Sequence, residues 1–197
     1  MSRLLPRSRK QLAALCVLAA LAGAAGAYER PSFGAGQNLA ASVTIQLAFT
    51  PGDDAAKLIM QALDGAKKQV LVQTYSFTSR PIAQALIAAK LRGVDVQLIA
   101  DREQASKMER NRVAEIADGG VPTFLDGEHQ SAHNKVMVID NGTANATVIT
   151  GSYNFTNAAQ FKNAENLLII RGNKALTDAY ARNWQRHRPH SVAFRRP

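Results

Sequence analysis

Two short apolar runs in the middle of the chain each adjoin a pair of polar residues spaced two positions apart. His133 and Lys135 precede the first run, and Ser152 and Asn154 follow the second. Because side chains alternate between faces along a strand, both members of each pair point the same way if the runs are β-strands. Pairing of the two strands then brings all four side chains to one edge of a sheet. The runs are Val136–Ile139 and Thr147–Thr150.

This set of side chains suits a phosphate group. It combines an imidazole, which can act as a nucleophile or an acid, with a fixed ammonium and two neutral hydrogen-bonding groups. A lone histidine on a strand is more often structural, and a lone lysine is more often a solvated charge. The combined spacing, together with the downstream Glu165, favours a phosphodiesterase site over those interpretations.

The motif resembles the signature of the phospholipase D superfamily, and its flanking sequences resemble the small bacterial endonuclease branch. The likeness extends over Val43–Trp184. One departure is the segment between Asp140 and Gly151, which holds ten residues where the family usually has about six. The extra residues are turn formers, which indicates a longer loop and an intact site. The signature reads His133-x-Lys135, four residues, Asp140, then Gly151-Ser152-x-Asn154, with Tyr75-Ser76-Phe77-Thr78 and Asn163-Ala164-Glu165-Asn166 as flanks.

Apolar runs of strand length alternate with helical patterns along the chain. This alternation predicts an α/β fold, and with the resemblance it implies a phospholipase D-like sandwich with a mixed β-sheet flanked by helices. A single helix is expected over Glu103–Asp118. The expected strands are 43–49, 70–75, 94–100, 121–125, 136–139, 147–150 and 166–171, and the other helices are 54–68, 80–92, a short one after Asn157, and 173–184.

The N-terminus has the pattern of a secretory signal peptide. Four basic residues precede the apolar stretch Leu12–Leu21, and small residues ending at Ala27 follow. Export to the periplasm or beyond is therefore expected, with an uncleaved anchor as the alternative. Cleavage lowers the net charge from +9 to +5, because the leader holds four basic and no acidic residues. The predicted organisation is 1–27 signal peptide, 28–41 linker or arm, 42–188 phosphodiesterase domain and 189–197 basic tail.

Phosphodiester cleavage needs a nucleophile, a proton for the leaving oxygen and positive charge at the phosphoryl oxygens. The sequence shows no acidic cluster with magnesium spacing and no cysteine after Cys16, so no metal and no cofactor are expected. His133 is the candidate nucleophile, through a phosphohistidine. Lys135, Ser152 and Asn154 are expected to hold the phosphate, and the resemblance implies that Glu165 orients His133.

Asp140 and Gly151 are interpreted as structural members of the motif. Asp140 lies five residues after Lys135, so strict alternation places it on the opposite face of the strand. We expect its carboxylate to form an ion pair or a hydrogen bond to a turn, next to Asn141 and Gly142.

One histidine cannot attack the phosphorus and also protonate the leaving oxygen. Larger members of the superfamily carry two copies of the motif, and this chain carries one. A homodimer that brings two His133 residues together would supply both functions, so the active site is predicted at a subunit interface.

Three functions remain open from the sequence. The first is a metal-independent nuclease for DNA, with RNA as a further substrate, which the positive charge also suits. The second is a phospholipase D acting on lipid headgroups, and the third is a non-catalytic nucleic-acid-binding or conjugation-associated protein. Outside the motif, His129 is interpreted as a loop residue, with a position at the substrate rim as the alternative. His187 and His190 are interpreted as solvated charges in the basic tail, with a metal role as the alternative. Tyr75 and Phe77 are interpreted as core residues, with base stacking as the alternative.

Overall fold

The structure, a computed structural model, describes residues 43–196. The predicted signal peptide, 1–27, and arm, 28–41, lie outside these residues. Within 43–196 every helix is too short or too polar to cross a membrane. The strands are β1 (Thr44–Thr50), β2 (Gln69–Thr74), β3 (Asp95–Asp101), β4 (Thr123–Asp126), β5 (Lys135–Ile139), β6 (Thr147–Gly151), β7 (Glu165–Arg171) and β8 (Val192–Ala193). The helices are α2 (Ala55–Asp64), α3 (Arg80–Leu91), α4 (Arg102–Lys107), α5 (Val113–Asp118), α6 (Asn157–Phe161) and α7 (Lys174–His187).

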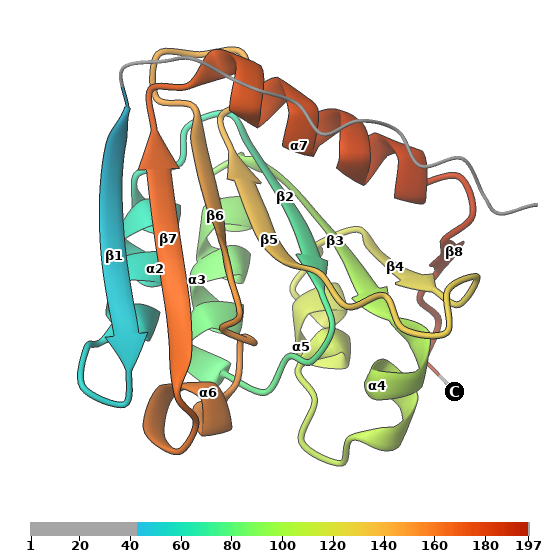
Figure 1. The fold of residues 1–197 in the computed structure, drawn as a ribbon. Helices are drawn as coiled ribbons and strands as arrows, with labels where there is room; N and C mark the ends of the chain where they lie inside the picture. Colours follow the sequence, from blue (N-terminus) through green and yellow to red (C-terminus); the bar gives the residue numbers. More distant parts are fainter. Residues whose placement is uncertain (1–42, 197) are drawn as a thin grey trace, which may run out of the picture. The chain divides into compact units, whose positions relative to one another are not determined.

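The strands form one mixed eight-stranded sheet with the order β1-β7-β6-β5-β2-β3-β4-β8 (Figure 1). β2, β3 and β4 run parallel to one another, as their helical connections require. The other neighbouring pairs are antiparallel. The predicted α/β class with a mixed sheet flanked by helices is therefore confirmed.

Helices cover the two faces of the sheet unequally. α2, α3 and α5 lie against one face, and α7 lies across the other (Figure 1). The alternation of β2 explains this division, because Val70 and Val72 pack with the first group of helices and Leu71 packs with α7. Trp184 fixes α7 in place, since its indole Nε1 donates a hydrogen bond to the carbonyl oxygen of Val72 at 3.0 Å.

The single helix expected over 103–118 is wrong, because the segment forms two short helices, α4 and α5. Met108 has extended backbone angles that end α4. The Asn111 side chain then bonds the carbonyl oxygens of Ala105 and Met108, and it accepts from the backbone N–H of Val113. These side-chain bonds replace the helical ladder, a competition that favours turns at asparagine.

The predicted basic tail contributes a strand to the sheet. β8 pairs with β4, with Phe124 opposite Ala193 and Leu125 opposite Val192. Residues beyond 188 are thus part of the folded domain as far as this pairing extends.

Candidate active site

Three strand ends meet at one edge of the sheet. β5 begins there, β6 ends there and β7 begins there, and the three strands are neighbours in the sheet (Figure 1). The register puts Gly151 opposite Leu167, two residues from Glu165. The fold therefore gathers the predicted site residues at a single edge, as the spacing of the two apolar runs indicates. These residues are His133, Lys135, Ser152, Asn154 and Glu165.

His133 and Lys135 are in direct contact. The Lys135 ammonium Nζ lies 3.0 Å from Nδ1 of His133 and donates to the carbonyl oxygen of His133 at 2.9 Å. The imidazole is exposed, whereas Lys135 is only 7% exposed. An ammonium can only donate, so Nδ1 of a neutral His133 accepts this bond and its proton resides on Nε2.

Tyr75 forms the wall beside this pair. Its ring centroid is 4.4 Å from that of His133, and the Lys135 ammonium lies 5.0 Å from the ring centroid. The Tyr75 hydroxyl accepts a hydrogen bond from Gln104 Nε2 at 3.0 Å, and Ser76 Oγ donates to Gln104 Oε1 at 2.9 Å. The aromatic ring therefore has a fixed place between the histidine and α4.

Burial lowers the pKa of the Lys135 ammonium below its ordinary value, and the nearby Glu165 carboxylate partly offsets this by raising it. Glu165 and Lys135 project from the same face of the sheet, since they share the alternation of Leu167 and Met137. The two charges therefore interact with each other, and a phosphate can bind to the lysine ammonium beside the carboxylate.

The expected hydrogen bond between Glu165 and His133 is not among those formed by the described residues of one chain. Glu165 Oε1 instead accepts from Asn163 Nδ2 at 2.9 Å, and His133 Nδ1 faces Lys135. The structure thus brings Glu165 into the site beside the lysine, and the orienting role for the imidazole stays a prediction.

Ser152 and Asn154 occupy the loop that follows β6. The Ser152 hydroxyl oxygen accepts from the backbone N–H of Asn166 at 3.0 Å and from its Nδ2 at 3.2 Å. The hydroxyl proton is consequently free to be directed at a ligand. The carbonyl oxygen of the Asn154 side chain is buried and has no hydrogen-bond partner in residues 43–196. An unsatisfied buried amide is costly unless a ligand or water completes it.

Gly151 is required by the close approach of β6 to β7. Its φ of +146° is rarely adopted by L side chains, and a Cβ there would lie 2.3 Å from the carbonyl oxygen of Asn166. That same oxygen accepts the backbone N–H groups of Ser152 and Tyr153 at 3.1 and 3.2 Å. The glycine therefore fixes the position of the serine.

Asp140 lies at the opposite end of β5 from Lys135. It is buried, and its carboxylate accepts from the backbone N–H groups of Lys67 (2.9 Å), Lys68 (2.7 Å) and Gln69 (3.0 Å). The carboxylate therefore binds the turn between α2 and β2, and not the turn at 141–142 that the sequence indicated.

Sequence reasoning missed two features around the site. The sequence favours a core position for Tyr75, with base stacking as the alternative, whereas its ring is half-buried and borders His133. Sequence reasoning also interpreted His187 and His190 as solvated tail residues. Both are less than a quarter exposed and contact the carboxylate of Asp126, because α7 and β8 return the tail to β4.

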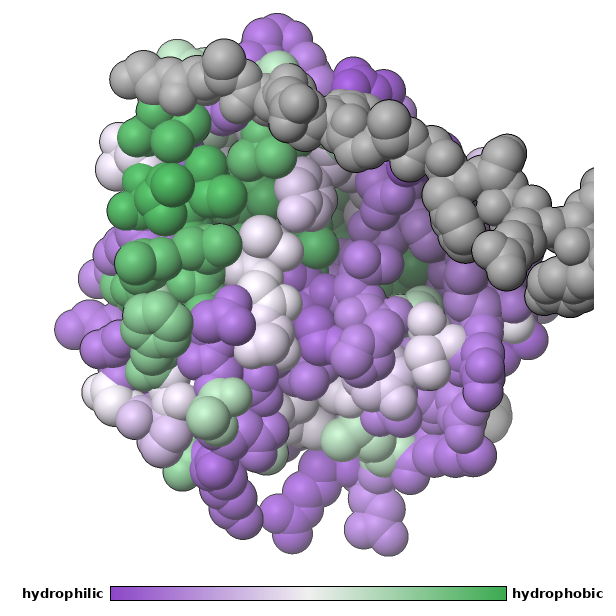
Figure 2. All heavy atoms as spheres, in the orientation of Figure 1, coloured by the Kyte–Doolittle hydropathy of each residue, from purple (hydrophilic) through white to green (hydrophobic). Residues whose placement is uncertain are grey.

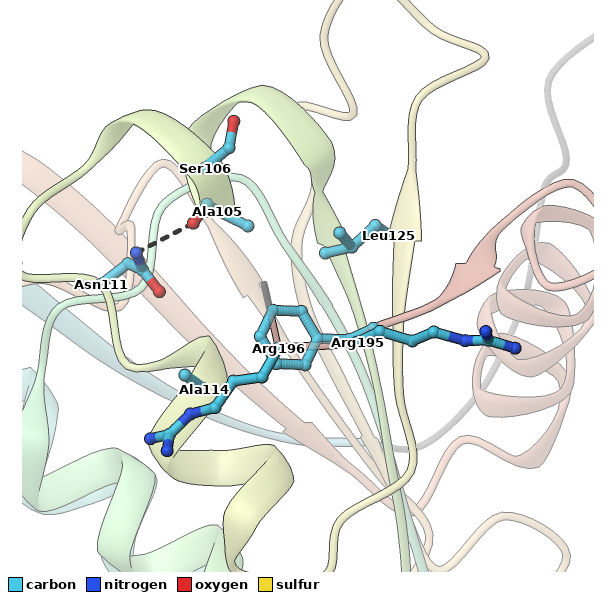
Figure 3. A pocket seen from close by; sticks show the side chains of 8 residues that line it. Ala105, Ser106, Asn111, Ala114, Leu125, Arg195 and Arg196 are labelled. Carbon is cyan, nitrogen blue, oxygen red and sulfur yellow. Dashed lines mark hydrogen bonds between the residues drawn. The ribbon is translucent and has the colours of Figure 1, made fainter.

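A separate hollow of about 550 Å³ lies between α4, α5 and the C-terminal segment (Figure 3). Its wall includes Asn111, Leu125 and Arg196, and none of the predicted site residues lines it. The chemistry predicted from the motif therefore belongs to the open sheet edge.

Comparisons with known proteins agree with this geometry. The family model for the cardiolipin synthase PLD-like domain matches residues 59–188. A phospholipase D of Rickettsia typhi is 36% identical over 151 residues, which cover 76% of this chain and 71% of that protein. A mitochondrial cardiolipin hydrolase of Xenopus laevis is 30% identical over 149 residues, covering 73% and 68%. The crystal structure of Nuc from Salmonella typhimurium, a phospholipase D family member, superposes with a TM-score of 0.73 at 34% identity, over 79% of this chain and 100% of Nuc.

Proposed function

The chain belongs to the phospholipase D family of phosphodiester hydrolases, and we propose that it is a nuclease that hydrolyses nucleic-acid phosphodiesters without a catalytic metal. The observation that carries the proposal is the contact of the buried Lys135 ammonium with the exposed His133 imidazole. This pair supplies a nucleophile and a fixed cation that can both contact the same phosphate group. Support for nucleic acid comes from the likeness to Nuc over its full length, from the positive net charge, which is +9 for the full sequence and would be +5 after the predicted cleavage, and from the partly exposed Tyr75 ring, on which a base can stack.

In the proposed reaction, Nε2 of His133 attacks phosphorus and the bond to the leaving oxygen breaks. A non-bridging oxygen of the substrate draws the Lys135 ammonium away from Nδ1, which can then carry the proton while Nε2 offers its lone pair. The Ser152 hydroxyl and the Asn154 side-chain NH2 donate hydrogen bonds to the phosphoryl oxygens. Water then cleaves the phosphohistidine and regenerates the imidazole.

The proton for the leaving oxygen must come from a second group, and we propose the His133 of a second copy of this chain. An apolar surface that suits a second copy adjoins the site. Ile45, Leu47 and Phe49 are more than half exposed on β1, where Figure 2 shows a hydrophobic patch. Phe49 pairs with Asn166, the residue that binds Ser152, so the patch reaches the site edge. Burial of such a patch between subunits is the usual fate of an exposed apolar surface.

The test is digestion of supercoiled plasmid and of single-stranded RNA in excess EDTA. Wild-type protein is expected to cut, and His133→Ala is expected to lose activity by at least about a thousandfold, since the nucleophile is gone. Gln130→Ala is the matched control, an exposed residue of the same loop. Cleavage by His133→Ala at the wild-type rate would overturn the proposal. Size-exclusion chromatography of the same samples reports the predicted dimer.

A lipid substrate is the second candidate, because relatives are named phospholipase D and mitochondrial cardiolipin hydrolase and because the β1 patch is apolar. Release of choline from phosphatidylcholine vesicles and of phosphatidic acid from cardiolipin vesicles is measured beside plasmid cleavage. Faster turnover of either lipid than of nucleic acid at matched phosphodiester concentration would favour this candidate over the nuclease.

We also propose export, on the pattern of the leader. Intact-mass measurement of the protein from cell fractions tests this, with a periplasmic or secreted form beginning at Tyr28 as the expected result. A full-length form confined to the cytoplasm would contradict it.

A further inference from the structure

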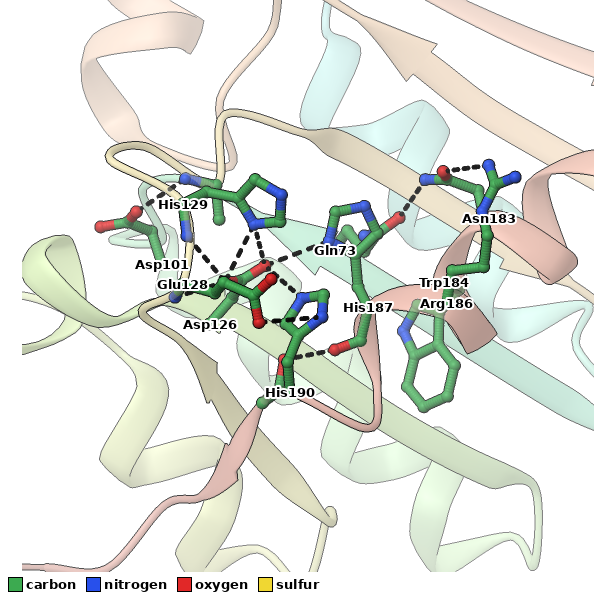
Figure 4. A network of polar contacts seen from close by, with 12 residues as sticks. Gln73, Asp101, Asp126, Glu128, His129, Asn183, Trp184, Arg186, His187 and His190 are labelled. Carbon is green, nitrogen blue, oxygen red and sulfur yellow. Dashed lines mark hydrogen bonds and ion pairs between the residues drawn. The ribbon is translucent and has the colours of Figure 1, made fainter. Parts of the chain in front are cut away.

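Three histidines and one aspartate converge on the side of the sheet formed by β4 and β8 (Figure 4). Asp126 is the last residue of β4, and His129 lies in the loop that leads from β4 to β5. His187 is the last residue of α7, and His190 lies in the turn before β8. The cluster therefore joins two segments that are about sixty residues apart in the sequence.

The ring nitrogens surround one carboxylate oxygen. Asp126 Oδ2 lies 3.1 Å from Nδ1 of His129, 3.1 Å from Nδ1 of His187 and 3.3 Å from Nε2 of His190. No two of the four candidate ligand atoms are more than 4.8 Å apart. The three ring centroids are 5.0–5.3 Å from one another, so the rings enclose a common centre.

We propose that Asp126, His129, His187 and His190 bind one Zn²⁺ ion. Three imidazole nitrogens and one carboxylate oxygen form a donor set that tetrahedral zinc accepts. Ligand bonds of about 2.0–2.1 Å place the corners of a tetrahedron about 3.3 Å apart. The three distances from Asp126 Oδ2 already match that edge, and the ring nitrogens, which lie within 4.8 Å of one another, would move closer together to complete the tetrahedron.

The arrangement is poorly satisfied by hydrogen bonds alone. The single Asp126 carboxylate would have to accept from all three imidazoles: His187 and His190 approach Oδ2, and Nδ1 of His129 lies 3.1 Å from Oδ2 and 3.2 Å from Oδ1. The other oxygen, Oδ1, already accepts the backbone N–H of Glu128 at 3.1 Å. Asp126 is 1% exposed, so its charge needs a strong partner.

Contacts outside the cluster orient the His190 ring and hold the backbone of His187. Nδ1 of His190 lies 3.6 Å from Oε2 of Glu128, an arrangement that resembles the carboxylate–histidine pairs behind many zinc ligands. Ser191 Oγ donates to the carbonyl oxygen of His187 at 2.7 Å, which fixes the turn that carries both histidines. Four protein ligands leave no position open for a substrate, so the ion is structural and not catalytic.

The position of the ion gives it a role in organising the active site. His129 precedes His133 by four residues in the same loop, and Asp101 Oδ2 accepts the backbone N–H of Ala132 at 2.9 Å. A zinc ion at this cluster would fasten the other half of the loop to β4 and α7. The nucleophile of the proposed reaction then emerges from a loop that is held at both ends.

The first test measures metal content. Untagged protein is stripped with chelator, dialysed against Zn²⁺, and analysed by elemental mass spectrometry and by calorimetric titration. One zinc per chain is expected, with Mg²⁺ and Ca²⁺ failing to compete because they prefer oxygen ligands. His129→Ala and Asp126→Asn are expected to bind at least about tenfold more weakly, whereas His133→Ala, which lies outside the cluster, keeps full affinity. Wild-type protein without stoichiometric zinc, or His129→Ala with unchanged affinity, would overturn the proposal.

A second measurement does not depend on how well the variants fold. Cobalt(II) added to stripped wild-type protein is expected to give the visible absorption of a four-coordinate ion, and one equivalent of Zn²⁺ should abolish it. The unfolding midpoint should rise by about 5–10 °C when zinc is present at a hundredfold excess over its dissociation constant. A six-coordinate cobalt spectrum together with an unchanged midpoint would refute the site.

This inference is separable from the proposed nuclease. Chelation is expected to lower the unfolding midpoint and to slow cleavage at 25 °C, because the loop that carries His133 loosens, but not to abolish cleavage, since the ion takes no part in the chemical step. Loss of cleavage in EDTA that zinc restores in wild type and in Gln130→Ala would support the zinc site while contradicting metal-free activity. Stoichiometric zinc in a protein that cuts no substrate would leave the site intact and reject the nuclease.

Discussion

Replacement of Asp140 tests whether a motif residue is structural. The Asp140 carboxylate holds three backbone N–H groups of the turn between α2 and β2. Five residues of strand separate it from Lys135, or about 17 Å at the rise of a β-strand. No direct contact with a phosphate at Lys135 is possible over that distance. We therefore expect Asp140 variants to lose stability while the folded fraction keeps its activity.

The size of the loss follows from these contacts. Hydrogen bonds to a charged group contribute about 1.5–3 kcal/mol each, but Lys67 and Lys68 are exposed, so water replaces part of what is lost. Asp140 also has a φ of +52°, which costs alanine about 1 kcal/mol more than aspartate. We expect Asp140→Ala to lower the free energy of unfolding by about 4 kcal/mol in total, or about 8–16 °C in melting temperature.

Asp140→Asn separates the geometry from the charge. Its remaining oxygen can still accept from Lys68 and Gln69, while its amide nitrogen faces the N–H of Lys67, so we expect a loss of about 1–2 kcal/mol. Asp64→Ala, at an exposed position near the same turn, should change stability by less than about 0.5 kcal/mol. Unfolding is followed by urea titration, and kcat is measured at 15–25 °C where each variant is folded. A normal urea midpoint with a hundredfold lower kcat in Asp140→Asn would refute the structural role.

Three further substitutions test the site and the assembly. Gly151→Ala places a Cβ 2.3 Å from the Asn166 carbonyl oxygen, and it should lower the free energy of unfolding by about 2–4 kcal/mol and remove most of the activity. The control Gly127→Ala, whose Cβ meets only the flexible end of a side chain, should lower the free energy of unfolding by less than about 1 kcal/mol. Equal losses of stability for the two variants in thermal melts would contradict the argument. Because burial lowers the pKa of Lys135, its charge and the substrate affinity should be lost as the pH rises, at a pH below 10.5. Lys135→Arg should shift this alkaline fall in kcat/KM to higher pH and lower the maximum of kcat/KM. A fall at the same pH in the variant would exclude the lysine as its source. Leu47→Glu on the exposed face of β1 should give a folded monomer with at least about tenfold lower activity, as measured by light scattering and plasmid cleavage, and a fully active monomer would reject the shared site.

The sequence could predict the strands and the site edge because both depend on local patterns. The two apolar runs predicted β5 and β6, and the antiparallel pairing of these strands brought the adjoining residues to one edge, although His133, Ser152 and Asn154 lie in the loops beside the strands. The family resemblance rests on the same residues. Confirmation of the fold and of the family follows from signals that are strongest in short, regular segments.

Only the tertiary structure decided the features that join distant segments. Helical periodicity over 103–118 does not reveal that the Asn111 side chain interrupts the backbone ladder. The place of Tyr75 against His133 depends on the pairing of β2 with β5, which brings their ends together.

The histidine cluster is the clearest case. His187 and His190 occur in a stretch rich in arginine, a composition typical of a solvated tail. They reach Asp126 because α7 crosses the sheet, Trp184 holds it there, and β8 pairs with the edge of β4. A sequence pattern within a few residues indicates which face of a strand or helix a side chain occupies. The residues that it contacts on that face depend on how the whole chain folds.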